Sequence, residues 1–170
     1  MHAPSDVQPQ VFSTLIAALR DEAGQLLGIR PIPANTGVKL LGLLYRAEAL
    51  SAQRYQLLLL RLEGAPNEAL QDTFTRREAM ERRHLAQLAQ RIAALGGEPP
   101  VLLAHSLGEV AETLPVVVSS LLAKRGMVKL YRAAIRFLAQ RDRDSAALLR
   151  LILKEEEAHI AAMRALVVPR

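Results

Sequence analysis

The chain has 170 residues and a formal net charge of +5, with 51% hydrophobic residues, only 4% aromatic residues, and no Cys or Trp. This length is typical of one domain with a sizeable core. The lack of Cys excludes disulfides and thiolate metal ligands. Residues 1–10 lack the features of a signal peptide, and apolar runs such as 57–60 are too short to cross a bilayer. We therefore expect a helix-rich cytoplasmic protein with no membrane association.

The first half of the chain predicts three helices. Residues 1–10 resemble a tail, and a short amphipathic helix follows over 11–27 and ends near Gly28. Residues 29–37, with two Pro, an Asn and a Gly, predict a break. Two long helices are expected next, over 37–62 and 66–95, and the second ends at Gly96-Gly97.

The second half predicts two more long helices after a connection that contains two prolines. One is expected from Ser106 to about Arg141, with a bend or restart at Pro115. The other begins at an N-cap, either Asp142 or Asp144, and ends near residue 168. Four long helices with one long connection predict an all-α, four-helix bundle over 37–170. Residues 1–36 add an N-terminal tail, a helix and a Pro-rich connection.

Acidic and histidine side chains interrupt the apolar stripes of three of these helices. Spacings of three and four residues place Glu48 on the inner face of the first long helix, and Glu81 with His84 on that of the second. Glu156 and His159 lie on the inner face of the last helix. Burying a lone carboxylate is costly unless a cation or hydrogen bonds compensate it, so these five residues predict a shared metal ion. Buried salt bridges are the competing interpretation. Carboxylate and imidazole ligands suit iron or manganese, although zinc would also bind.

These residues and their spacing resemble the bacterioferritins, within the ferritin-like superfamily. The resemblance rests on Glu48 with Tyr55 seven residues later and on two Glu-x-x-His motifs, Glu81/His84 and Glu156/His159, and it covers about residues 38–168. It implies that Glu81 and Glu156 bridge two metals, with Glu48 and His84 completing one metal and His159 serving the other. Tyr55 would be a hydrogen-bonding or redox-active phenol beside the site. Family members oxidise ferrous iron with oxygen or peroxide.

The family's remaining ligand, a Glu on the third long helix, has no counterpart here. The position corresponds to Ala123 or, with one residue of loop shift, Lys124, and no Asp or Glu occurs from Thr113 to Gln140. One firmly held ion, a second weakly held ion, or no metal are the possible outcomes. An inward Lys124 would neutralise the carboxylates in place of the second ion. A solvent-facing Lys124 is the competing interpretation.

Two further departures bear on cofactor and assembly. Arg82 stands where bacterioferritins have the haem-binding Met, and Met80 precedes Glu81, so we expect no haem. The chain ends soon after His159, without the fifth helix of cage-forming ferritins, and it carries an extra N-terminal helix. We therefore expect a homo-oligomer, with a dimer favoured over a twenty-four-subunit cage.

The third long helix also carries a basic face. Arg125, Lys129, Arg132 and Arg136 recur at spacings of four, three and four. This face could bind nucleic acid, as in DNA-protecting ferritin relatives. We favour instead an ordinary solvated face paired with acids on a neighbouring helix or subunit.

Two classes of function follow from the sequence. The first is a metal-binding protein with an incomplete di-metal site that holds one or two iron or manganese ions, with ferrous oxidation or oxygen activation as its reaction. The second is a non-catalytic ferritin-fold protein that acts through oligomerisation or anion and DNA binding. A third, an enzyme acting on an organic substrate, has no substrate indicated by the sequence.

Overall fold

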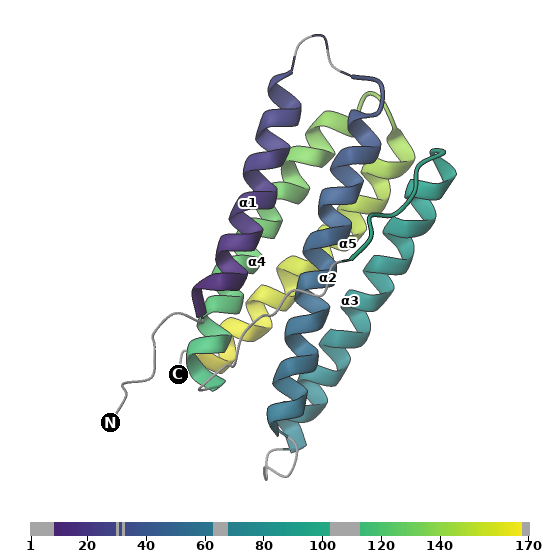
Figure 1. Cartoon of the computed structure of the whole chain (residues 1–170). Helices are drawn as coiled ribbons and strands as arrows, with labels where there is room; N and C mark the ends of the chain where they lie inside the picture. Colours follow the sequence, from purple (N-terminus) through teal and green to yellow (C-terminus); the bar gives the residue numbers. More distant parts are fainter. Residues whose placement is uncertain (1–8, 30, 32, 63–67, 103–112, 168–170) are drawn as a thin grey trace. The chain divides into compact units, whose positions relative to one another are not determined.

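All regular structure in the described part of the chain is α-helical. A computed structural model describes residues 9–29, 31, 33–62, 68–102 and 113–167. The five helices are α1 (Pro9–Gly28), α2 (Thr36–Leu62), α3 (Glu68–Ala94), α4 (Thr113–Leu138) and α5 (Arg143–Val167) (Figure 1). The predicted all-α class with an additional N-terminal helix is confirmed. None of these helices is long and apolar enough to cross a membrane.

The helices fall into two compact units. One contains residues 1–37 and 106–170, and therefore α1, α4 and α5; the other is Val38–His105, with most of α2 and all of α3. The predicted domain division between residues 36 and 37 stays a prediction.

The second unit is an antiparallel hairpin of α2 and α3. Contacts join the end of α2 to the start of α3, and other contacts join the start of α2 to the end of α3. The Gln71 side-chain amide donates to the Leu62 carbonyl at 2.5 Å, and the rings of Tyr55 and Phe74 lie 5.9 Å apart. At the other end, Val38 lies against Gly97, where an added Cβ would meet the Val38 Cγ1 at 2.6 Å.

In the first unit, α4 packs against both α1 and α5. Gly126 marks the close approach of α1, because a Cβ there would lie 2.9 Å from the Ile16 Cγ2. Pro115 falls in the first turn of α4, where a missing N–H leaves no intrahelical bond unmade. The described part of α4 begins at Thr113, and the predicted start at Ser106 lies outside the described residues.

Local capping explains two predicted helix ends. The Asp142 carboxylate accepts a hydrogen bond from the Ser145 backbone N–H at 3.1 Å, so Asp142, rather than Asp144, is the N-cap of α5. At the end of α3, the N–H of Gly96 donates to the Ala93 carbonyl and that of Gly97 to the Ile92 carbonyl. This is a Schellman motif, and Gly96 has the left-handed φ of +75° that the motif requires.

Gly96→Ala should lower the free energy of unfolding by about 1 kcal/mol, because the left-handed backbone disfavours a Cβ. An added Cβ there meets nothing within 4 Å, so backbone strain alone is tested. Gly24→Ala is the matched control: Gly24 lies inside α1, also with nothing within 4 Å and without a positive φ. It should raise stability by about 0.5–1 kcal/mol. Urea unfolding followed by circular dichroism measures both; equal effects would contradict the capping assignment.

Candidate metal centre

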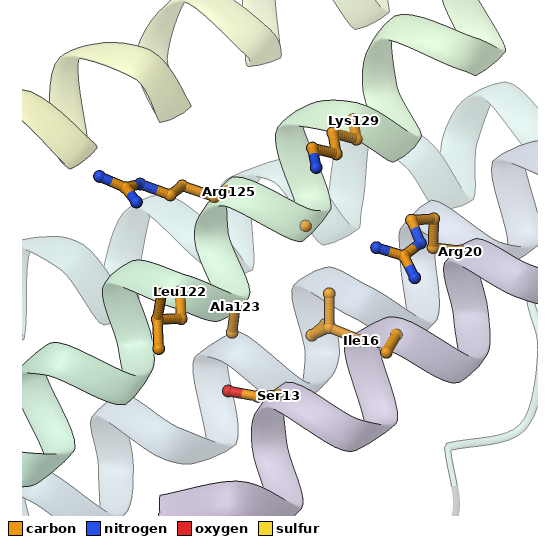
Figure 2. Close-up of a pocket in the computed structure, with 9 residues that line it drawn as sticks. Ser13, Ile16, Arg20, Leu122, Ala123, Arg125 and Lys129 are labelled. Atoms are coloured by element: carbon orange, nitrogen blue, oxygen red, sulfur yellow. The ribbon is translucent and has the colours of Figure 1, made fainter.

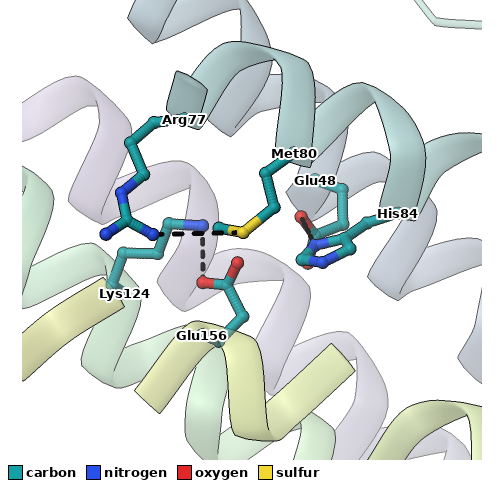
Figure 3. Close-up of polar contacts among 6 residues, drawn as sticks. All are labelled: Glu48, Arg77, Met80, His84, Lys124 and Glu156. Atoms are coloured by element: carbon teal, nitrogen blue, oxygen red, sulfur yellow. Dashed lines mark hydrogen bonds and ion pairs between the residues drawn. The ribbon is translucent and has the colours of Figure 1, made fainter. Parts of the chain in front are cut away.

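The α2–α3 hairpin brings three of the predicted ligands together. Glu48 on α2 and Glu81 with His84 on α3 are all 0% exposed. The Nδ1 of His84 lies 3.3 Å from the Oε2 of Glu48 (Figure 3). Each of the three residues offers a ligand atom within 4.8 Å of those of the others. A cluster of buried oxygen and nitrogen donors that could hold a metal therefore exists within this hairpin.

The apolar residues around these donors explain their orientation. Glu48 shares its helix face with Leu41, Leu44 and Leu58, and all three are buried. On α3, Phe74 and Leu88 lie seven residues before and after Glu81 and are also buried. Because burial of these apolar side chains sets the rotation of each helix about its axis, the acids between them must face inward.

The chemistry of this donor set fits a divalent metal ion. Two carboxylates and an imidazole buried together place oxygen and nitrogen donors in an interior where charged groups need compensation. A divalent cation provides this compensation and accepts both donor types. Two ligand atoms each about 2.1 Å from one ion, at an angle of about 100°, lie about 3.2 Å apart. The observed 3.3 Å between His84 and Glu48 matches this separation.

The other two predicted ligands lie on α5. Glu156 and His159, three residues apart on one helix face, are both 0% exposed. Ile152 and Met163 precede and follow them on the same face and are also buried.

Lys124 of α4 is buried and forms an ion pair with Glu156. Its side chain is 1% exposed, and its Nζ lies 2.6 Å from the Glu156 Oε2 (Figure 3). Lys124 therefore faces inward, which is one of the two orientations that the sequence left open. Removing either partner of a buried pair leaves a buried charge uncompensated, so the two residues depend on one another.

Ala123, the other residue at the position of the absent third-helix ligand, is 2% exposed and has no donor atom. Neither Ala123 nor Lys124 is therefore a metal ligand of the carboxylate kind. α4 instead provides a cation next to Glu156.

Tyr55 packs within the hairpin. It is 2% exposed, and its ring is tilted by 44° against that of Phe74. Tyr55 lies two helical turns after Glu48, and helix side chains lean toward the N-terminus, so its ring leans toward the Glu48 end of α2. Its role as a phenol beside the metal stays a prediction.

Arg54 is a buried cation that the sequence analysis missed. It is 5% exposed, and burial lowers its pKa to about 10, an effect partly offset by the charge of Tyr55. The guanidinium is therefore still charged near neutral pH. Arg54 follows Ala47 by seven residues and Ser51 by three and precedes Leu58 by four, and all of these are buried. This spacing among apolar and small residues of α2 is the sequence signal that could have predicted an inward Arg54.

The four residues of the predicted basic face of α4 are exposed, and one of them has an ion-pair partner on α5: the Arg132 Nη2 lies 2.7 Å from the Glu157 Oε1. This pair agrees with the favoured interpretation of a solvated face paired with a neighbouring helix.

Arg82, at the position of the family's haem-binding Met, is exposed and pairs with Glu78 one turn earlier on α3. Met80 is half-buried, with its sulfur 3.9 Å from the Arg77 Nη1 (Figure 3). His2 and His105, which were given no role, lie outside the described residues.

Comparison with known proteins identifies the family of this chain. Residues 38–168 match the ferritin-like domain family, whereas no curated protein matches the chain. The match spans α3, α4, α5 and nearly all of α2, and it excludes α1. The predicted resemblance to the ferritin-like superfamily is thus confirmed, and the chain belongs to the ferritin-like domain family.

Proposed function

We propose that this protein binds one divalent iron or manganese ion in the interior of its ferritin-like fold. Glu48, Glu81, His84 and Glu156 are the proposed ligands, with His159 as an additional donor. The main support for this proposal is the fully buried cluster of Glu48, Glu81 and His84 in the α2–α3 hairpin.

The Lys124–Glu156 ion pair supports one ion rather than two, because the Lys124 ammonium lies 2.6 Å from the Glu156 carboxylate. In the hairpin, the buried donors of Glu48, Glu81 and His84 offer ligand atoms for one divalent ion. Lys124 thus takes the place that a second metal would have, and it explains how the chain dispenses with the third-helix Glu.

Ferrous oxidation is the reaction we propose for this site. Bound iron would supply the redox chemistry with oxygen or peroxide. Glu81 and Glu156 would hold the ion, Glu48 and His84 would complete its ligand set, and the apolar residues around them would exclude water. Tyr55 is the candidate redox-active or hydrogen-bonding phenol. A cytoplasmic location and a homodimeric assembly remain part of the proposal.

The Lys124–Glu156 pair also favours a second candidate function. A carboxylate already compensated by an ammonium has less need of a metal, as expected of a ferritin-like protein that has lost its redox centre and acts by association. The two candidates differ in one measurable quantity, the metal content.

Glu81→Gln should abolish stoichiometric metal binding, because it removes one of the two hairpin charges while preserving side-chain size. Elemental analysis of protein purified without affinity-tag nickel, before and after anaerobic iron(II) loading, measures this. We expect about one equivalent in the unsubstituted protein and almost none in the variant. Glu98→Gln, at an exposed position, is the control and should retain the metal. Absence of metal from the unsubstituted protein in both conditions would favour the associative function.

Lys124→Met should have opposite effects on stability and on metal affinity. Without metal, loss of the ammonium leaves the Glu156 charge less compensated and should lower the free energy of unfolding by about 3–5 kcal/mol. With metal, removal of a repelling cation should tighten iron(II) or manganese binding by about tenfold or more. Lys154→Met, at an exposed site on α5, should change neither. Denaturation with and without metal, together with calorimetric titration, tests this; unchanged affinity in Lys124→Met would refute the proposed role of Lys124.

A further inference from the structure

A cavity between α1 and α4 carries several cationic side chains over an apolar floor. Its volume is about 240 Å³. Arg20 of α1 and Arg125 and Lys129 of α4 line it, and Ile16, Ala17 and Leu122 are among its apolar lining residues (Figure 2). Figure 2 shows the side chain of Arg125 extending from α4 away from those of Arg20 and Lys129. Of the described residues that line it, none is acidic.

The contacts of these cations leave charge for a ligand. The Arg20 Nη2 lies 3.2 Å from the Asp21 Oδ1, but both side chains are largely exposed, so this pair contributes little. Arg125 and Lys129 are exposed on α4, and unlike Arg132 they do not pair with the described acids of α5. Three cationic residues that line one concavity form a site for an anion of more than one charge.

We propose that this cavity binds a small organic phosphate, a phosphate monoester with a compact apolar body. A phosphate monoester carries about −1.5 to −2 charge at pH 7, which suits three cations better than a single carboxylate does. Arginine also presents donors in a fork that matches phosphate oxygens. The apolar residues Ile16, Ala17 and Leu122 give the ester group a surface to contact.

Size and composition favour a small ligand over nucleic acid. The cavity is below the about 300–1,000 Å³ of sites for drug-sized molecules, so only a small body fits. It has no aromatic residue on which a base could stack. Gly126 lets Ile16 approach α4 closely and thereby closes the floor. None of these residues is a proposed metal ligand, so this proposal is independent of the metal site.

Calorimetric titration of the full chain with butyl phosphate, in low-salt buffer free of phosphate, tests the proposal. We expect one site that binds butyl phosphate more tightly than inorganic phosphate or butyrate. Arg125→Gln and Lys129→Gln should each weaken binding about ten- to a hundredfold, as expected for loss of one charged hydrogen bond. Arg136→Gln makes the same charge change at an exposed position of α4 outside the cavity and should leave the affinity unchanged.

Ala17→Met provides a steric test without a charge change. Filling the floor should remove the preference for butyl phosphate over inorganic phosphate, and circular dichroism would verify that the variant is folded. The proposal is overturned if butyl phosphate does not bind, if inorganic phosphate binds equally well, or if Arg136→Gln weakens binding as much as Arg125→Gln. Binding of a DNA duplex that both Arg variants weaken equally, without butyl phosphate binding, would indicate an extended nucleic-acid surface instead.

Discussion

The burial of ionisable side chains among tightly packed helices is the constraint on which the interior of this protein depends. Among the described residues, six acidic or basic side chains on four helices are at most 1% exposed; they are Glu48, Glu81, His84, Lys124, Glu156 and His159. An isolated buried charge costs several kcal/mol, and an apolar residue of similar size would often be neutral or stabilising in its place. Stability alone therefore gives no reason for this set. A ligand or charge partner shared by several of these residues does give one, and this is the physical basis for proposing a metal centre.

The two units of the chain meet this constraint differently. In the α4–α5 pair, an ammonium 2.6 Å from a carboxylate balances the charge with protein atoms alone. In the α2–α3 hairpin, two acids and one imidazole are buried together, and their donor atoms lie close enough to bind one metal ion. The absent third-helix Glu therefore does not by itself imply loss of the metal, because the donors of Glu48, Glu81 and His84 are all present within the hairpin.

Much of the fold could be predicted from the sequence, because local signals determine where helices end. Gly96 adopts the left-handed conformation that stops α3, and Asp142 caps α5, as the residue types indicate. The inward positions of Glu48, Glu81 and Glu156 followed from spacing alone. The orientation of Lys124 was harder, because α4 is apolar on more than one face. Spacing groups Lys124 with Met127, Tyr131 and Leu138, all buried, but Ala123 and Leu130 on an adjacent stripe are buried too. α4 packs against both α1 and α5, which accounts for its buried residues on more than one face. The sequence of α4 alone does not indicate these two partners.

The same double packing gives the basic residues of α4 their place. With α1 and α5 both packed on this helix, the exposed cations Arg125, Lys129, Arg132 and Arg136 occupy the face that remains. At its edge nearest α1, Arg20 adds a cation from a second helix, and Ile16 reaches under it toward Gly126. A convex stripe of charge binds counterions diffusely, whereas charges on two helices around an apolar floor can select an anion by size and shape. α1, which lies outside the matched ferritin-like region, therefore does more than cover α4: it provides one wall of the cavity that α4 lines on the other side.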